Sequence, residues 1–527
     1  MKHLLFPVAI LCFLSTISLA QNPVLGNPAE LPFSMQMEEV TQDELPGLHS
    51  SAFAHWEEWW IFIGGRVGGL HGFFPFTAFP ENEANAQIWL INPETGDMHS
   101  FGVDALLIPF VDPLKATNPQ YAQDGEWFFM AGGYGKEAST GDFITFPMLT
   151  AVHLPTLVSI MVNNGNPSAA FRQIQSENMR VCGGEMDKMG DYFYLVGGHD
   201  FSGKYTQTPS ASFTQEYTYE IRKFRINLQG TGLSITDYTV HHDEANLRRR
   251  DFTLAPVIRP DGSQALCLYG GVFRPDVDLP YYNPVYIDEN QIFMMDAGYE
   301  QVFSQYTCPA VPLFDSTDGS MYTMLFAGLS THYFDQGSQT VKYDERVPFI
   351  RDISTFCRRA DGSSVEYLMP QRFDALLGSN MVFVPTETAP QYGNEVFKLR
   401  QMQGKTFVGW LFGGIKADIP NITTSSASKR MFKVYITPKQ SSHTLQPAGD
   451  SLFVRVVPNP LGSNQAPELE VSGVFSAFQL CNMEGMVIRH TEQLEELGEW
   501  LGVAPPGVYM VVAAGEQGRV VTRILRF

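Results

Sequence analysis

The sequence has little basic charge and no long apolar run beyond its first twenty residues. It contains 35 Lys and Arg against 56 Asp and Glu, so its formal net charge is -21. A chain this acidic does not neutralise phosphates, which argues against nonspecific nucleic-acid binding and against adhesion to anionic membranes. We expect the acidity to keep an exported protein soluble. No transmembrane segment is predicted.

Cysteine is also scarce, with six in 527 residues. Cys12 falls in the N-terminal apolar stretch, and the others are widely spaced without a CxxC pair. An odd, dispersed set excludes a disulfide framework. We expect buried thiols that act as small hydrophobic side chains, with at most one or two disulfides. The five are Cys182, Cys267, Cys308, Cys357 and Cys481.

Motifs of the common catalytic classes are missing. There is no G-x-S-x-G elbow, no H-E-x-x-H pair and no phosphate-binding loop. The run at 241–244 carries metal-capable side chains, but neighbours on an extended chain point to opposite sides, so we expect a solvated loop. The DSTDG run at 315–319 resembles part of a sialidase Asp-box with the wrong spacing, and we expect a hairpin turn there. The sequence therefore predicts no catalytic residue, no metal site and no cofactor.

Residues 1–20 have the features of a signal peptide. A short polar start precedes an apolar stretch, and the small residues Ser18 and Ala20 suit cleavage before Gln21. The apolar stretch is short for a bilayer span, and polar residues follow it at once. We therefore expect a soluble exported protein, in which residues 21–44 form an N-terminal segment ahead of the first domain.

One pattern recurs six times: a short aromatic and aliphatic run that ends in two small residues, such as WWIFIGG. Each run is typical of a strand buried on both faces, and paired glycines let the backbone turn or approach a neighbour where a Cβ would not fit. Six copies in order at similar spacing indicate a repeat architecture. The runs end at Gly65, Gly133, Gly198, Gly271, Gly328 and Gly414.

The remainder of each repeat reads as further strands separated by turns, which gives the four strands of a propeller blade. Residues 45–440 resemble kelch repeats in the apolar run, the glycine pair and the strands that follow. Three departures are Ala327 in place of a first glycine, the typical second-half Trp that is mostly missing, and repeats longer than the kelch norm of ~50 residues. The resemblance implies an all-β fold with a six-bladed kelch-like β-propeller. Its long loops at 66–86, 199–216 and 329–349 are the expected binding elements.

From residue 446 onward the pattern changes to short strands and turns, with one short helix predicted at LEELGEWL. Residues 446–527 by themselves predict a small β-sandwich. They also resemble the type A sorting domain of the type IX secretion system of Bacteroidota, which has a PNP turn, an L-x-N-x-x-G-x-x-V hairpin and a P-x-G-x-Y strand. The terminal ILRF departs from that family, in which a basic residue often closes the chain. The matching residues include Pro458, Asn459, Pro460, Asn482, Gly485, Gly507 and Tyr509.

The resemblance to a sorting domain implies that outer-membrane secretion machinery is a partner. It further implies passage across the outer membrane, removal of the domain, and either release or attachment at the cell surface. The alternative is an ordinary terminal β-sandwich.

Charged residues precede the inner strands of three repeats at similar places. In kelch propellers such places lie near the mouth of the central channel, so the resemblance implies a ring that binds a polar or anionic ligand. The alternative is a set of salt bridges between blades, because buried charges require partners. The candidates are Arg180, Arg250, Asp251, Arg372 and Asp374.

Three functions fit these features. We expect first a secreted or cell-surface binding protein whose propeller recognises a glycan or another protein. The second is a glycan-acting enzyme (a hydrolase, lyase or isomerase) that uses the central pocket. The third is a structural or adhesion component, which predicts flat polar faces without an enclosed pocket.

Overall fold

The computed structural model divides into two compact units, Met1–Lys439 and Gln440–Phe527. The predicted signal peptide at residues 1–20 lies outside the described residues. Among the described residues, no helix has the length and apolar character needed to cross a membrane. The structure describes residues 24–42, 44–206, 213–289, 292–293, 298–421, 424–439, 453–457, 468–472, 476–482, 487–515 and 518–526.

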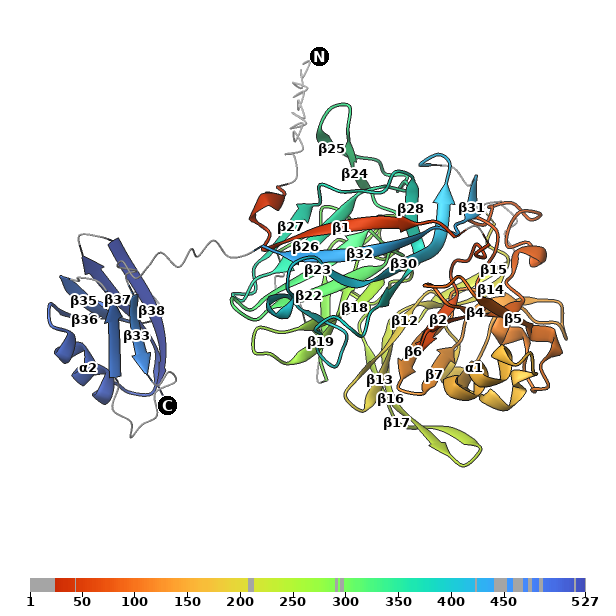
Figure 1. The fold of residues 1–527 in the computed structure, drawn as a ribbon, viewed down its shortest axis with the longest axis horizontal. Helices are drawn as coiled ribbons and strands as arrows, with labels where there is room; N and C mark the ends of the chain where they lie inside the picture. Colours follow the sequence, from red (N-terminus) through yellow and green to blue (C-terminus); the bar gives the residue numbers. More distant parts are fainter. Residues whose placement is uncertain are drawn as a thin grey trace, which may run out of the picture. The chain divides into compact units, whose positions relative to one another are not determined.

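Among the described residues of the first unit, six sheets each have a core of four antiparallel strands, and in five of them these four strands follow one another along the chain (Figure 1). In each sheet four strands pair in simple meander order. The first sheet consists of β2 (Ala52–Trp56), β3 (Trp59–Ile63), β4 (Gln87–Ile91) and β5 (Met98–Gly102), and the second of β6 (Gln120–Asp124), β7 (Trp127–Ala131), β10 (Met148–His153) and β11 (Phe171–Gln175). The third consists of β12 (Glu185–Met189), β13 (Tyr192–Val196), β16 (Glu220–Gln229) and β17 (Gly232–His242), and the fourth of β18 (Thr253–Ile258), β19 (Gln264–Tyr269), β20 (Val285–Ile287) and β21 (Ile292–Phe293). The fifth consists of β22 (Ala310–Asp315), β23 (Ser320–Phe326), β26 (Ile353–Arg358) and β27 (Ser364–Leu368), and the last of β28 (Leu376–Pro385), β30 (Thr406–Ala417), β32 (Met431–Pro438) and β1 (Phe33–Val40).

These sheets pack against one another in a closed ring. Ile61 of the first sheet and Phe128 of the second share one hydrophobic cluster, and equivalent clusters join each later pair of sheets. A sixth cluster joins the last sheet to the first, with the rings of Trp60 and Trp410 centred 5.8 Å apart. Strands buried between neighbouring sheets explain the continuous apolar runs of the sequence. The architecture is that of a β-propeller.

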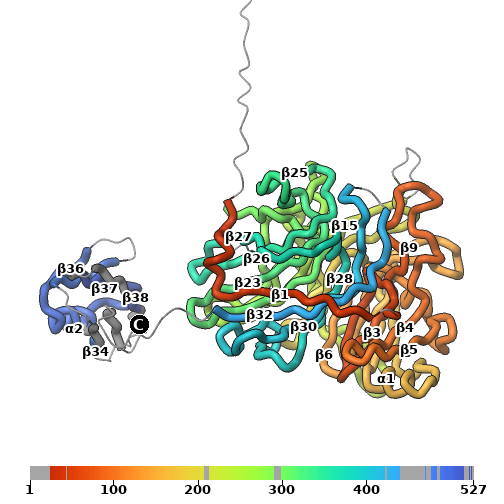
Figure 2. The backbone as a smooth tube through the Cα atoms, turned by 45° about the horizontal axis from the view of Figure 1, so that its top comes forward, coloured from red at the N-terminus to blue at the C-terminus, as the bar shows by residue number. Residues whose placement is uncertain are grey.

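The last sheet takes its outer strand from the beginning of the chain. Strand β1 pairs with β32 from Phe33 opposite Pro438 to Val40 opposite Met431, and the two strands lie side by side in Figures 1 and 2. From the sequence, residues 21–44 are expected to precede the propeller, and the structure differs on this point. The strand carries no glycine pair, so the repeat pattern does not include it. Both ends of the first unit are therefore tied into one sheet.

The glycine pairs lie at or near the end of the second strand of each sheet, where it approaches the next sheet. Gly132 and Gly133 have φ of +64° and +90°. A Cβ on Gly132 would lie 1.9 Å from the carbonyl oxygen of Val181, and the Gly133 N–H donates to that same oxygen at 2.9 Å. The prediction that paired glycines permit a close approach is confirmed.

The fifth repeat shows how an alanine replaces the first glycine of a pair. Ala327 keeps a left-handed φ of +57°, and the close approach is made possible from the other side by Gly378. A Cβ on Gly378 would lie 2.2 Å from the Phe326 carbonyl oxygen and 2.9 Å from the Ala327 Cβ. At this interface a glycine of the next sheet therefore provides part of the space.

Several connections contain structure of their own. The helix α1 (Leu154–Val162) buries Leu157 and Met161 between the first two sheets; the sequence does not predict it, because nine residues carry too short a helical period. Three hairpins are inserted after glycine pairs: β8 (Tyr134–Lys136) with β9 (Phe143–Thr145), β14 (His199–Gly203) with β15 (Phe213–Tyr217), and β24 (His332–Asp335) with β25 (Thr340–Tyr343). Two short strands, β29 (Phe397–Lys398) and β31 (Ser425–Ala427), extend the last two sheets.

The second unit is a small β-sandwich with one helix, as predicted. Helix α2 (Leu494–Val503) buries Leu497 and Leu501 together with Phe478 of the larger sheet. The smaller sheet pairs β33 (Phe453–Val457) with β34 (Glu468–Ser472). The larger sheet has the order β36 (Val487–Thr491), β35 (Ala477–Cys481), β37 (Gly507–Gly515) and β38 (Gly518–Arg526).

Candidate functional site

Six residues in the left-handed conformation surround the centre of the propeller, one from each sheet, at or just before its first strand. Their φ values lie between +49° and +63°, a region that Gly, Asn and Asp adopt most readily. Backbone hydrogen bonds link consecutive members: Asn118 donates to Ser50 at 3.0 Å, for example, and Asp251 donates to Gly183 at 2.7 Å. We call this set the central ring. Its members are Ser50, Asn118, Gly183, Asp251, Thr307 and Asn380.

The central ring separates two cavities. The larger, which we call the upper pocket, has a volume of about 560 Å³ and is lined by residues of the three long loops predicted from the sequence. The smaller has a volume of about 240 Å³ and is lined mainly by the first strands of the sheets. Five of the six ring residues border both cavities. The upper pocket falls in the volume range typical of small-ligand sites.

The wall of the upper pocket is assembled from two positions in every repeat. One position directly precedes each central-ring residue, and the other directly follows each glycine pair. The two positions of a repeat are paired across an antiparallel bridge, as His49 is with Arg66 and Cys182 with His199. The first position holds His49, Thr117, Cys182, Arg250, Tyr306 and Ser379. The second holds Arg66, Tyr134, His199, Val272, Leu329 and Ile415.

This wall mixes polar and apolar side chains around the ring. Arg66, His199 and Arg250 come from the first four repeats together with Val272, and the last two repeats contribute Leu329 and Ile415 together with Tyr306 and Ser379. Aromatic rings from the connecting loops complete the lining. They are Phe73, Phe79, Phe201, Tyr205, Phe273 and Phe349.

Both arginines of the wall are paired with a carboxylate. Arg250 forms an ion pair with Asp251, and Arg66 pairs with Glu83 at 3.0 Å. Burial lowers the pKa of Arg250, but Asp251 together with Tyr217 and Tyr205 raises it above its ordinary value. The Nε atom of each arginine has no hydrogen-bond partner among the described residues. Each guanidinium is thus a fixed donor group with an unused N–H, and not a free positive charge.

Three imidazoles of the upper pocket are neutral near pH 7. Burial, with a smaller effect of Arg66, lowers the pKa of His49 to about 3, and burial lowers that of His71 to about 4. Burial also lowers the pKa of His199 well below its usual value. These rings therefore act as hydrogen-bonding groups and not as cations.

Hydrogen bonds at Nδ1 assign opposite roles to two of these rings. The Nδ1 of His71 lies 3.0 Å from the Gly72 carbonyl oxygen, which only accepts, so Nδ1 carries the proton and Nε2 is an acceptor. The Nδ1 of His199 lies 2.7 Å from Nε2 of Gln215, which donates, so the Nε2 of His199 carries the proton. The upper pocket therefore offers one imidazole acceptor and one imidazole donor.

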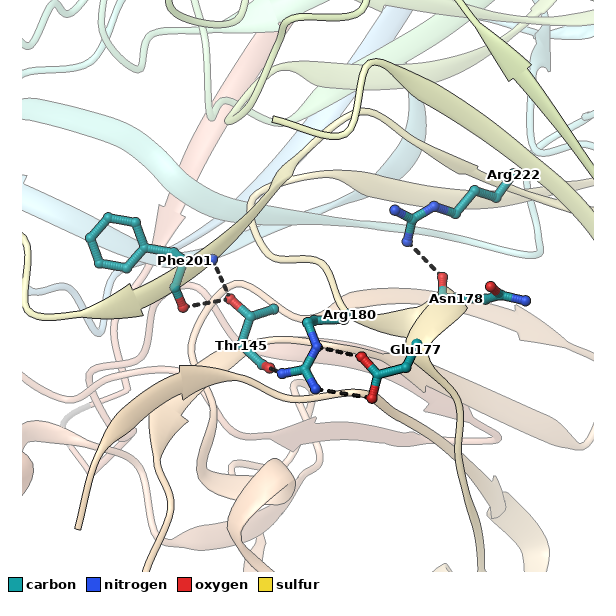
Figure 3. A network of polar contacts seen from close by, with 6 residues as sticks. All are labelled: Thr145, Glu177, Asn178, Arg180, Phe201 and Arg222. Atoms are coloured by element: carbon teal, nitrogen blue, oxygen red, sulfur yellow. Dashed lines mark hydrogen bonds and ion pairs between the residues drawn. The ribbon is translucent and has the colours of Figure 1, made fainter. Parts of the chain in front are cut away.

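Of the five candidates predicted from the sequence, Arg250 and Asp251 line the upper pocket. Arg180 does not: it pairs with Glu177 at 2.7 Å and donates to the Thr145 carbonyl at 2.8 Å, and Figure 3 shows these partners. Both residues of that ion pair lie in one connection, so the pair is not a salt bridge between blades, and only the hydrogen bond to Thr145 ties this connection to another.

Arg372 and Asp374 are also outside the upper pocket lining. Arg372 pairs with the buried Asp352 at 3.3 Å, and Asp374 accepts a hydrogen bond from Arg430 at 2.7 Å. Like Arg250, these three candidates are charged residues that precede an inner strand. Unlike Arg250, none of them directly precedes a residue of the central ring. The informative signal in the sequence is the residue that follows each glycine pair, because its offset from a recognisable motif is constant.

Other features singled out from the sequence carry no chemistry of their own. His241 and His242 are exposed as expected, but they end strand β17 instead of lying in a loop. The DSTDG run is the hairpin turn between β22 and β23, as predicted. The five mature cysteines are free and buried. In the described part of the chain, no group of three His, Cys, Asp or Glu residues is placed to hold a metal ion.

The residues of the sorting-domain resemblance are only partly described. Asn482 follows β35 and Gly507 begins β37. The Tyr509 hydroxyl donates to the Pro505 carbonyl at 2.8 Å, so the conformation that precedes β37 is held by this side chain. Four motif residues lie outside the described residues: Pro458, Asn459, Pro460 and Gly485.

Comparison with protein-family models gave no match, and comparison with curated proteins gave none. Among solved structures, the chain is similar to the structure of YjhT, with 10% sequence identity and a TM-score of 0.39. The similarity covers 75% of this chain and 99% of that chain. A TM-score this low carries no argument about the site, so the propeller architecture rests on the sheets and clusters described above.

Proposed function

We propose that this chain is an exported binding protein that holds a glycan in the upper pocket. The observation that carries the proposal is the make-up of that cavity, whose volume is about 560 Å³ and whose floor is the central ring. The lining combines fixed donors and acceptors with apolar and aromatic side chains. A sugar ring has hydroxyls at its edge and C–H groups on its faces, so it needs both kinds of contact.

The arginines support a ligand with an acidic or hydroxyl-rich group. The guanidinium groups of Arg66 and Arg250 line the upper pocket and suit an oxygen acceptor, and the His199 Nε2–H adds a third donor. A structural or adhesion role predicts flat faces without an enclosed cavity, so the upper pocket argues against it.

Export is the second part of the proposal. It is supported by the signal-peptide features of residues 1–20 and by the sorting-domain resemblance of residues 446–527, which would make outer-membrane secretion machinery a partner. Expression with and without the last 82 residues, followed by assay of the culture medium and the cell surface, tests this part. Equal export of both chains would contradict it.

Binding is tested by screening the mature full-length chain on a glycan array and titrating the hits by calorimetry. Arg250→Lys keeps a positive charge beside Asp251 but removes the guanidinium fork, and it is expected to weaken binding at least tenfold. Arg180→Lys is the matched control, because Arg180 is also ion-paired but lies outside the upper pocket. Wild-type silence on the array with capture of a protein instead would refute the glycan proposal.

The paired imidazoles favour one alternative, a glycan-acting enzyme. In that case Nε2 of His71 would act as a general base, while the Nε2–H of His199 would donate a hydrogen bond to a substrate oxygen. NMR spectra of a bound glycan recorded over hours distinguish the two functions. Conversion that is lost in His71→Gln would establish the enzyme, whereas an unchanged spectrum would leave binding as the function.

A further inference from the structure

The loop 66–86 presents two phenylalanines to solvent beside the upper pocket. Phe76 is 96% exposed and Phe74 is 65% exposed, while Phe73 and Phe79 of the same loop line the upper pocket. Grouped, exposed apolar side chains mark an interaction surface on a soluble protein. We call Phe74, Pro75 and Phe76 the aromatic knuckle.

Internal hydrogen bonds hold the aromatic knuckle in one conformation. The N–H groups of Thr77 and Ala78 both donate to the Phe74 carbonyl oxygen, at 2.9 and 2.8 Å, and the Gly72 N–H donates to the Thr77 carbonyl at 2.9 Å. Proline at position 75 restricts the backbone between the two rings. The backbone that carries the two exposed rings is therefore preorganised, which lowers the entropic cost of binding.

The same loop is anchored to the wall of the upper pocket. The His71 ring stacks on Phe79 with centroids 4.1 Å apart, and Phe73 contacts Tyr205 edge-on at 5.8 Å. The Leu70 N–H donates to the hydroxyl of Ser425 in the last sheet at 2.8 Å. One anchored segment thus contributes Phe73 to the inside of the pocket and the next residue, Phe74, to its rim.

The surroundings of the aromatic knuckle favour a glycan over a membrane or a protein. An anionic membrane is disfavoured by the net charge of -21. Stable protein interfaces need a broad apolar centre, whereas here the two rings stand beside a polar cavity. Flat rings next to such a cavity fit the apolar faces of consecutive sugar units.

We infer that Phe74 and Phe76 form a second subsite, which stacks on further sugar units of a glycan chain whose end occupies the upper pocket. The ligand is then an oligosaccharide or polysaccharide and not a free monosaccharide. This inference rests on the proposed function of the upper pocket and specifies its ligand.

The test is the dependence of affinity on chain length. Calorimetry on the mature full-length chain uses the monomer, trimer and hexamer of four probes: β-1,4-linked glucose, xylose, mannose and galacturonate. For at least one series, affinity is expected to rise tenfold or more from monomer to hexamer. In the double variant Phe74→Ala, Phe76→Ala the rise is expected to fall below threefold while monomer affinity stays unchanged. Leu107→Ala, which removes an apolar side chain 84% exposed on another loop, is the matched control.

The outcomes separate the two proposals. Monomer binding without a length-dependent rise, or a rise retained in the double variant, overturns the second subsite and leaves the upper pocket intact. Absence of wild-type binding in all four series contradicts the proposed function and the second subsite together. Loss of liposome or protein binding in the double variant, without effect on glycans, would assign the knuckle to another occupant and overturn the inference.

Discussion

Replacing Gly132 by alanine tests why every repeat carries paired small residues. Gly132 has φ of +64° and approaches the neighbouring sheet. Gly125, with φ of +57°, has the same left-handed conformation, but no atom lies within 4 Å of the place that a Cβ would take there. The two substitutions therefore share the backbone strain and differ in the contact with the next sheet.

The magnitude follows from adding the separate effects. An alanine in the left-handed region costs about 1–2 kcal/mol at either site. At Gly132 the new Cβ would lie 1.9 Å from the Val181 carbonyl oxygen, and relieving such overpacking costs about 1–3 kcal/mol more. The shift also weakens the Gly133 hydrogen bond to that oxygen, worth about 1 kcal/mol. We expect Gly132→Ala to cost roughly 3–6 kcal/mol and Gly125→Ala roughly 1–2 kcal/mol.

The assay is equilibrium unfolding of the mature chain in urea, followed by tryptophan fluorescence and near-ultraviolet circular dichroism. Trp60, Trp127 and Trp410 lie in the propeller, so fluorescence reports mainly on that unit. A difference between the two variants of less than about 1 kcal/mol, within the range of strain alone, would show that close approach between sheets does not explain the pairs.

Three other perturbations address the fifth repeat, the ring closure and a buried carboxyl. Gly378→Ala is expected to destabilise the fold by about 3–5 kcal/mol, through the same kinds of contact and strain as at Gly132. Ala327→Gly is expected to change the free energy of unfolding by less than about 1 kcal/mol. Similar effects of the two substitutions in urea unfolding would contradict the idea that Gly378 provides the space at this interface. Deleting residues 21–41 removes β1 and exposes the edge of β32, so thermal unfolding should occur at a lower temperature and a synthetic β1 peptide should partly restore it. Burial raises the folded-state pKa of Glu185 to about 8, above its unfolded value, so the folded state favours the protonated carboxyl. The contribution of Glu185 to the free energy of unfolding is therefore most favourable below about pH 4.5 and is lost as the pH rises through 8. Glu185→Gln should flatten that decline in denaturant titrations at pH 5 and pH 9, and an unchanged slope would refute it.

Local features made most of the fold predictable. Each apolar run and its glycine pair are adjacent in sequence, so a short stretch of chain reveals both. The glycines are needed where the backbone approaches the next sheet closely, as Gly132 approaches Val181. The signal for β1 is weak, because its pairing with β32 is a contact between the two ends of the first unit. The helix α1 escapes prediction because nine residues give too short a period.

The candidate site was predictable only in part. Arg250 and Asp251, two of the five candidates from the sequence, line the upper pocket together with residues of the long loops. Arg180 and Arg372 resemble Arg250 locally, yet their side chains pair with Glu177 and Asp352 instead of lining the upper pocket. Whether a side chain faces the centre depends on how many residues separate it from the central ring, and the charge of the neighbouring residues does not reveal this.

The sequence alone therefore determined the all-β class, the repeats and the positions of their sharp turns, because strand burial and left-handed glycines depend on short stretches of chain. Tertiary structure decided which residues share the upper pocket. His49, His199 and Arg250 come from three different repeats and meet only because the six sheets close into a ring. Closure brings one position per repeat to a common centre, so the chemistry there is a property of the ring and of no single segment.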